Sequence, residues 1–178
     1  MKILKSITLT TLLFLAIGIN AQSKKDQKII KDANKAKNKL MKMEVGLDHF
    51  FTNSAGYVVF PNVGKGGFII GGASGNGVVY ENGTMIGMAN LKKLSVGLQA
   101  GGQAITEIIF FETEADLAEF KEGDFEFSAE ASAVALKSGI AVNAKYRDGV
   151  AVFALPKAGL MADASVGGQK FDYKPMMN

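Results

Sequence analysis

From Gly56 onward the sequence changes to an alternation of apolar and polar residues interrupted by glycine, and this change constrains the fold most. Nineteen of the 21 glycines lie from Gly56 onward. In residues 125–133, FEFSAEASA, the odd positions are apolar and the even ones are polar, so a strand there would bury one face. Residues 140–146 repeat this pattern. The alternation predicts a β-rich core over residues 56–173.

Two dipeptides predict the turns of this core. Asn82-Gly83 and Asp148-Gly149 each separate two strand-like runs, and both tolerate the positive φ angles of two-residue hairpin turns. Neighbouring strands are therefore expected to be mostly antiparallel. One interruption, residues 113–121, predicts a short helix with Thr113 as its N-cap and Asp116 at the capping-box position.

Small residues within the strand-like runs indicate strong curvature. Residues 97–102 and 129–135 carry glycine and alanine where larger side chains would fill space, and glycine in a strand indicates a bend or a close backbone approach. We therefore expect an α+β, β-rich fold built on a strongly curved antiparallel sheet. A barrel-like form and a sandwich are both compatible with the pattern. An N-terminal amphipathic helix and the short internal helix complete the expected fold.

The segment before the core predicts the amphipathic helix. Its apolar residues recur at steps of three and four: Ile29, Ala33, Ala36, Leu40, Met43 and Leu47. Residues 48–51 continue this helix or form another short turn before residues 53–56 end it. Residues 22–45 carry eight lysines against three acidic residues, a balance of +5, whereas residues 46–178 have a balance of −4. A basic arm of this kind indicates either an anionic partner or a solvated helix face.

The first 21 residues are typical of a secretory signal. Lys2 and Lys5 precede an apolar stretch over residues 9–19, and cleavage is expected after Ala21. The uncharged run 6–23 leaves an uncleaved anchor as the alternative. Residues 22–178 are then expected to form one exported domain, periplasmic or secreted, with a helical arm over 22–50. Because the chain has no cysteine, disulfides, a thiolate metal site and a lipoprotein acyl group are excluded.

A glycine-flanked lysine in the run VVFPNVGKGGFIIGGASGNG, residues 58–77, resembles a phosphate-binding loop at first sight. Lys65 is followed by Gly66 instead of a hydroxyl residue, and the apolar residues after it predict a strand instead of a helix. We therefore expect no nucleotide and no cofactor. Lys65 is expected at a sheet turn formed with Gly64, Gly66 and Gly67, where it could meet a headgroup phosphate or serve as an exposed turn residue.

Candidate catalytic and metal-binding residues are few. Ser74 lies among glycines, but a nucleophile elbow needs glycine where the chain has Asn76, so a turn is expected there. His49 is the only histidine, so a catalytic triad would have to use it. We expect it instead to be an ordinary side chain near the end of a helix. The alternating acids at 112, 114 and 116 lack the glycine of a calcium loop and are explained by helix capping. We expect neither an enzyme nor a metal site, and no nucleic-acid partner.

Several of these residues together resemble the SYLF domain. The resemblance rests on Phe60-Pro61, Lys65, Gly67-Phe68, Gly71-Gly72, Gly75 and Gly77, on the segment 96–101, and on residues 157–160 and 164–168. The chain departs from the family in having no tryptophan and in carrying Gly167 where a glutamate is usual. The resemblance implies a non-enzymatic lipid-binding domain. Eukaryotic relatives bind phosphoinositides through an amphipathic N-terminal helix, and some bind actin.

The leading hypothesis is therefore an exported protein that associates peripherally with anionic phospholipid headgroups. The expected lipid-binding residues are Lys24, Lys25, Lys28, Ile29, Ile30, Lys31, Ala33 and Lys65. For an exported protein, phosphatidylglycerol or cardiolipin is the expected lipid. Two alternatives are a carrier that holds a small apolar ligand in a barrel cavity, and a hydrolase that acts through Ser74.

Overall fold

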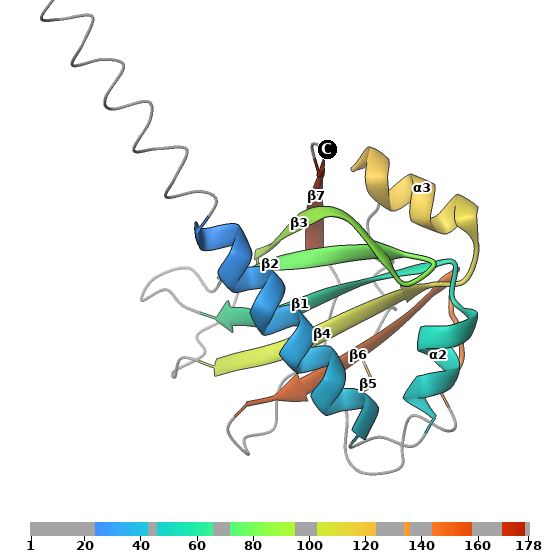
Figure 1. Ribbon diagram of the computed structural model, residues 1–178, viewed down its shortest axis with the longest axis horizontal. Coiled ribbons are helices and arrows are strands. Elements are labelled where there is room, and N and C mark those ends of the chain that lie inside the picture. Colours follow the sequence, from blue (N-terminus) through green and yellow to red (C-terminus); the bar gives the residue numbers. More distant parts are fainter. Residues whose placement is uncertain are drawn as a thin grey trace, which may run out of the picture.

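One strongly twisted sheet organises the molecule, and helices pack on both of its faces (Figure 1). The structure is a computed structural model that describes residues 24–42, 46–65, 72–94, 103–123, 134–135, 144–157 and 169–176. The predicted α+β, β-rich class with an N-terminal helix is confirmed.

In the part of the chain that the structure describes, the sheet has seven strands in the order β5-β6-β4-β1-β2-β3-β7. Their bounds are β1 Gly56–Lys65, β2 Gly72–Glu81, β3 Thr84–Leu94, β4 Gln103–Phe111, β5 Val134–Ala135, β6 Val150–Pro156 and β7 Gln169–Pro175. All neighbours pair antiparallel except the two-residue β5, which pairs parallel with β6. Over the described residues, β5 and β7 are the two edges, so this part of the chain forms one open sheet instead of a closed barrel or two stacked sheets.

The predicted turns are present, whereas one predicted strand is not. Asn82 and Gly83 have φ of 50° and 76° and join β2 to β3, and Asp148 and Gly149 have φ of 48° and 74° before β6. Residues 144–146, the described part of the strand expected over 140–146, are not in a strand, and Arg147 forms only an isolated bridge with Val150. The runs 97–102 and 125–133 lie outside the described residues.

A proline in the central strand β1 is accommodated by a bulge. Pro61 has no N–H to donate to a ladder, so a central strand tolerates it only at an irregularity. The register of β1 shifts on both sides at this point, between Val59 and Asn62 toward β2 and between Phe60 and Val63 toward β4. The Pro61 carbonyl instead accepts a hydrogen bond from Thr106 Oγ1 at 3.2 Å. The Phe60-Pro61 pair of the predicted motif therefore bends the middle of the sheet.

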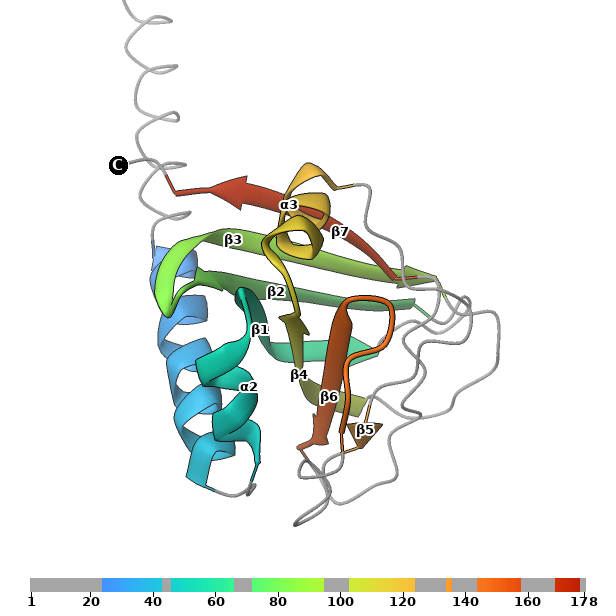
Figure 2. The same ribbon diagram turned by 90° about the vertical axis from the view of Figure 1, so that its right-hand side faces the viewer.

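Each face of the sheet buries its own core. One core holds the N-terminal helix and α2, Leu47–Asn53, against rings and aliphatic side chains that include Tyr57, Phe110 and Phe153. The other core holds α3, Glu114–Glu122, through its Leu117. Figure 2 shows the N-terminal helix and α2 together on the same side of the sheet.

α3 lies close to its predicted bounds, whereas Leu47, predicted on the apolar face of the N-terminal helix, instead begins α2. The N-terminal helix covers residues 24–42, and α2 is the second short helix, beginning after Gly46, whose φ is 102°. α3 is confirmed with its capping box: the Thr113 hydroxyl accepts from the Asp116 N–H, and the Asp116 carboxylate accepts from the Thr113 N–H at 2.9 Å. None of the helices in the described ranges combines the length and the apolar composition that crossing a membrane requires.

Candidate functional site

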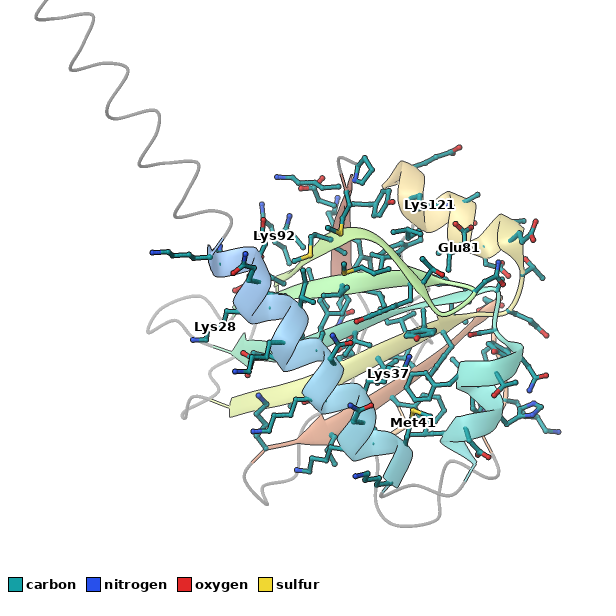
Figure 3. All side chains as sticks on the ribbon, in the orientation of Figure 1. Lys28, Lys37, Met41, Glu81, Lys92 and Lys121 are labelled. Carbon is teal, nitrogen blue, oxygen red and sulfur yellow. The ribbon has the colours of Figure 1, made fainter. Side chains whose placement is uncertain are left out.

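The outward side of the N-terminal helix carries a dense row of positive charge. Six lysines recur there at steps of three and four residues and form what we call the lysine ridge: Lys24, Lys28, Lys31, Lys35, Lys39 and Lys42. At about 3.6 residues per turn they occupy about a quarter of the helix circumference over about 27 Å. All six are exposed, and Figure 3 shows Lys28 projecting from the helix into solvent.

The ridge keeps its positive charge available. Among the described residues, no ridge lysine forms an ion pair with a carboxylate. Lys121, which lies outside the ridge, does form one, with its Nζ 3.2 Å from Glu81 Oε1. A shallow, open hollow follows the ridge and is lined by Lys31, Asp32, Lys35, Asn38, Lys39 and Lys42. Lys25 is also exposed, beside the ridge. The predicted lysines 24, 25, 28 and 31 thus share one exposed side with three more that the prediction did not include.

The opposite side of the helix packs on the sheet. Ala33 and Leu40 are buried, and Ile29, Ile30 and Ala36 are partly buried against the same core. The three apolar residues predicted to bind lipid, Ile29, Ile30 and Ala33, therefore lie on the side that contacts the sheet. Their role toward lipid stays a prediction.

Lys37 is the lysine of the helix that turns toward the sheet. Its Nζ lies 5.4, 5.0 and 5.3 Å from the ring centroids of Phe51, Tyr57 and Tyr80, and it donates a hydrogen bond to the Tyr57 hydroxyl. Figure 3 shows Lys37 between the helix and α2. We call these three rings the aromatic cage. An ammonium within about 6 Å of a ring face is attracted to it.

Burial changes the acid–base behaviour of the cage. Desolvation lowers the pKa of Lys37 from its ordinary 10.5, while the ring faces and the Tyr57 hydroxyl oppose that shift by favouring the ammonium. Desolvation also raises the pKa of Tyr57 and of Tyr80 to about 12. The two rings stack at 4.9 Å, and the Tyr80 hydroxyl donates to Asn34 Oδ1 at 3.0 Å. The phenols are therefore neutral, and they fix the middle of the helix to the sheet.

Lys65 does not belong to the N-terminal helix; it is the last residue of the central strand β1. Its backbone pairs with Ala73 of β2 and Gln103 of β4, so it is the last strand residue before the connection 66–71. That connection, with Gly66 and Gly67, lies outside the described residues. The headgroup role of Lys65 stays a prediction.

The candidate catalytic residues are on separate elements. Ser74 is an exposed residue within β2, paired with Gly64 and Lys92, so the turn predicted around it is wrong: the bulged β1 and β3 pair with this glycine-rich run as a strand. His49 lies in α2, and its Nδ1 is 2.9 Å from Nδ2 of Asn53 in the same helix. The described residues contain no hydrogen bond between Ser74 and His49. They also contain no group of three or more potential metal ligands.

Two polar residues that point inward, the partly buried Lys37 and the buried Glu107, were missed by the sequence interpretation. Lys37 follows Ala33 and precedes Leu40 at steps of four and three, so the helical period could have placed it on the sheet side. Glu107 alternates with Ile105 and Ile109 in β4, is 1% exposed, and accepts a hydrogen bond from Gln169 Nε2 at 3.2 Å. Both signals are periodicities in which one polar residue occupies an apolar position.

Comparison with known proteins gives two similarities. Residues 92–178 match the family Ysc84, described as Las17-binding protein actin regulator. The chain is also 32% identical over 83 residues to Beta cell expansion factor A of Aeromonas veronii. That similarity covers 46% of this chain and 32% of the relative, so the chain matches about a third of the relative's length.

Proposed function

Because residues 92–178 belong to the Ysc84 (SYLF) family, we propose that this chain is a non-enzymatic protein that binds the anionic phospholipid surface of a membrane. The family match begins after the N-terminal helix, so the helix has to be judged by its own chemistry. The description of the family concerns Las17 and actin, and the relative is named for beta cell expansion. Neither name states a lipid.

The lysine ridge is the observation that carries the proposal. Six exposed ammonium groups lie on a nearly straight line of about 27 Å. Such a row suits contact with a flat surface better than contact with a small molecule. Each lysine near an anionic bilayer surface contributes about 1 kcal/mol of attraction, and the contribution falls within a Debye length. The sheet side of the helix supports the ridge by holding it in one orientation. The ridge therefore fits phosphate headgroups in a surface.

The expected location of the protein belongs to the same proposal. A secretory signal over residues 1–21 would deliver the chain to a compartment whose membrane surface is rich in anionic phospholipid, with phosphatidylglycerol or cardiolipin as the expected headgroups. The protein would then be peripheral, held by charge at the surface. Its partner is the membrane itself, with no nucleotide, nucleic acid, metal or cofactor required.

Vesicle co-sedimentation tests the proposal. We expect the protein to sediment with phosphatidylglycerol or cardiolipin vesicles, to stay in solution with phosphatidylcholine vesicles, and to be released as salt rises, because screening shortens the reach of the lysines. Equal binding to neutral and anionic vesicles would contradict the proposal. Saturable binding of a free apolar ligand without vesicles would favour the carrier, and ester hydrolysis lost in Ser74→Ala would favour the hydrolase.

Lys65 supplies a second, smaller contribution in this proposal. Lys65→Gln is expected to lower affinity for anionic vesicles severalfold, as one surface charge contributes about 1 kcal/mol. The melting temperature should stay almost unchanged. Unchanged affinity would leave Lys65 as the last residue of a strand and nothing more. Saturable ATP binding by the parent protein would contradict the expectation that this loop holds no nucleotide.

A further inference from the structure

The N-terminal helix has two chemically different sides, and its apolar side is already engaged. Ala33 and Leu40 are at most 1% exposed against the sheet. Rings of α2 cover part of this core as well, since Phe50 lies against Phe110 and Phe153. The sheet residues of the core that the two helices share are at most 5% exposed: Tyr57, Val59, Val78, Tyr80, Ile108, Phe110, Ala151 and Phe153. A helix that left the sheet to insert into a bilayer would uncover both surfaces.

Insertion would recover only one of those two surfaces. The apolar side of the helix could enter the acyl region, but the rings and aliphatic side chains of the sheet would be left facing water. The sheet side also carries buried hydroxyl groups that are satisfied by the helix, since Tyr80 donates to Asn34 and Tyr57 accepts from Lys37. Release would remove both hydrogen bonds as well as the cage contacts.

The ridge, by contrast, needs no rearrangement to reach a phosphate. Its six lysines already point away from the sheet and are exposed. Lys37 points toward the sheet and could not reach a membrane surface while the helix is docked. Its ammonium group is held by the three rings of the cage. The cage thus fixes which side of the helix meets the solvent.

We propose that the protein binds anionic lipid with this helix docked on the sheet: the lysine ridge contacts headgroup phosphates while the apolar side and Lys37 stay in place. This inference rests on the proposed function and specifies its mode. Binding is then a surface contact without insertion, and the ligand is the layer of headgroup phosphates and not the acyl chains.

A single tryptophan at the cage reports whether the helix stays docked. The chain has no tryptophan, so Phe51→Trp gives one fluorophore beside Lys37. We expect its emission and its quenching by acrylamide to be unchanged when phosphatidylglycerol vesicles are added to saturation, and no quenching by brominated acyl chains. Leu40→Glu in the same background should expose the tryptophan and serves as the control for an undocked helix. A red shift or bromolipid quenching on vesicle binding would overturn the proposal.

A covalent tether provides the second measurement. The chain has no cysteine, so Asn34→Cys with Tyr80→Cys can be joined by a short bismaleimide across the position of their hydrogen bond. We expect the tethered protein to bind anionic vesicles within about twofold of the same protein before cross-linking. A loss of affinity of about tenfold or more on cross-linking would overturn the proposal of docked binding. It would not overturn the proposal that the protein binds lipid. Failure of the parent protein to bind would overturn both proposals.

Discussion

At the scale of single residues, Lys37 shows how one helix position can differ from its neighbours. Of the eight lysines between residues 24 and 42, it is the one that is partly buried. Lys37→Glu would place a carboxylate against ring faces that carry partial negative charge. We expect this variant to lose about 1–2 kcal/mol of unfolding free energy in urea denaturation, because an attraction becomes a repulsion.

Lys39→Glu is the matched control, since it makes the same change of charge two positions along the helix. Lys39 belongs to the exposed ridge, so its unfolding free energy should stay within about 0.5 kcal/mol of the parent. Equal losses in the two variants would show that net charge, and not the cage, determines the effect.

The two cage tyrosines predict a pH dependence at high pH. Their pKa values are raised to about 12 in the folded chain, against 10.0 when exposed, so the folded state keeps protons that the unfolded state releases. Stability that is complete below pH 10 is therefore lost as pH rises toward 12. Lys37 acts in the opposite sense, since its lowered pKa adds stability as pH rises to 10.5, but it is one group against two.

Urea denaturation at several pH values across this window measures the effect. We expect the unfolding free energy of the parent to fall between pH 10 and 12, and that of Tyr80→Phe to fall less. Tyr146, whose pKa is also raised to about 12, contributes equally to both proteins. A parent profile that is flat across the window would contradict the burial of these phenols.

Gly77 is required by the ring of Phe60 beside the β1 bulge. A Cβ at this position would lie 2.6 Å from Phe60 Cδ1 and 2.8 Å from the Val59 carbonyl oxygen. Gly77→Ala should therefore cost about 1–3 kcal/mol of unfolding free energy through overpacking. Gly64→Ala is the control, because a Cβ there meets nothing within 4 Å. Calorimetry of both variants checks the difference, and equal melting temperatures would argue against the close approach.

At the scale of elements, α3 depends on its N-terminal cap. Thr113→Ala removes the hydroxyl that accepts from the Asp116 N–H, and a lost cap costs about 1 kcal/mol. The helix holds Leu117 and Phe120 in the core, so the loss should appear in global unfolding in urea. Thr113→Ser keeps the hydroxyl and should retain most of the stability. Identical losses in both variants would contradict the role of the cap.

Elements with local signals were predictable from the sequence. The cap of α3 and the Asn82-Gly83 turn depend on residues within four positions of each other, so their chemistry can be read directly. The strand that contains Ser74 was missed because glycines favour a turn locally, whereas pairing with β1 and β3 imposes a strand. The order of strands also depends on distant partners, such as β7 beside β3, and no local pattern specifies it.

The candidate site divides in the same way. The lysines of the ridge follow the helical period, so their shared side was predictable from spacing. The inward position of Lys37 depends on rings contributed by α2, β1 and β2, which lie up to 43 positions away in the chain. Sequence periodicity can place Lys37 on the apolar side, but only the folded arrangement brings the three rings around its ammonium group.

At the scale of the whole molecule, charge is separated between the helix and the rest of the chain. Residues 22–45 have a balance of +5, and residues 46–178 have a balance of −4. A separation of this kind orients a protein at a negatively charged surface, with the basic side inward. The ridge, and not the total charge of +3, should therefore control binding.

Affinity for anionic vesicles in two variants of equal net charge tests this claim most directly. One variant replaces three ridge residues, Lys28, Lys31 and Lys35, with glutamine, and the other replaces three exposed lysines elsewhere, Lys92, Lys145 and Lys174. At about 1 kcal/mol per lysine, we predict that the ridge variant binds phosphatidylglycerol vesicles roughly a hundredfold more weakly than the parent. The control variant should stay close to the parent. Equal weakening of the two variants would contradict the account, because net charge would then explain binding without the ridge.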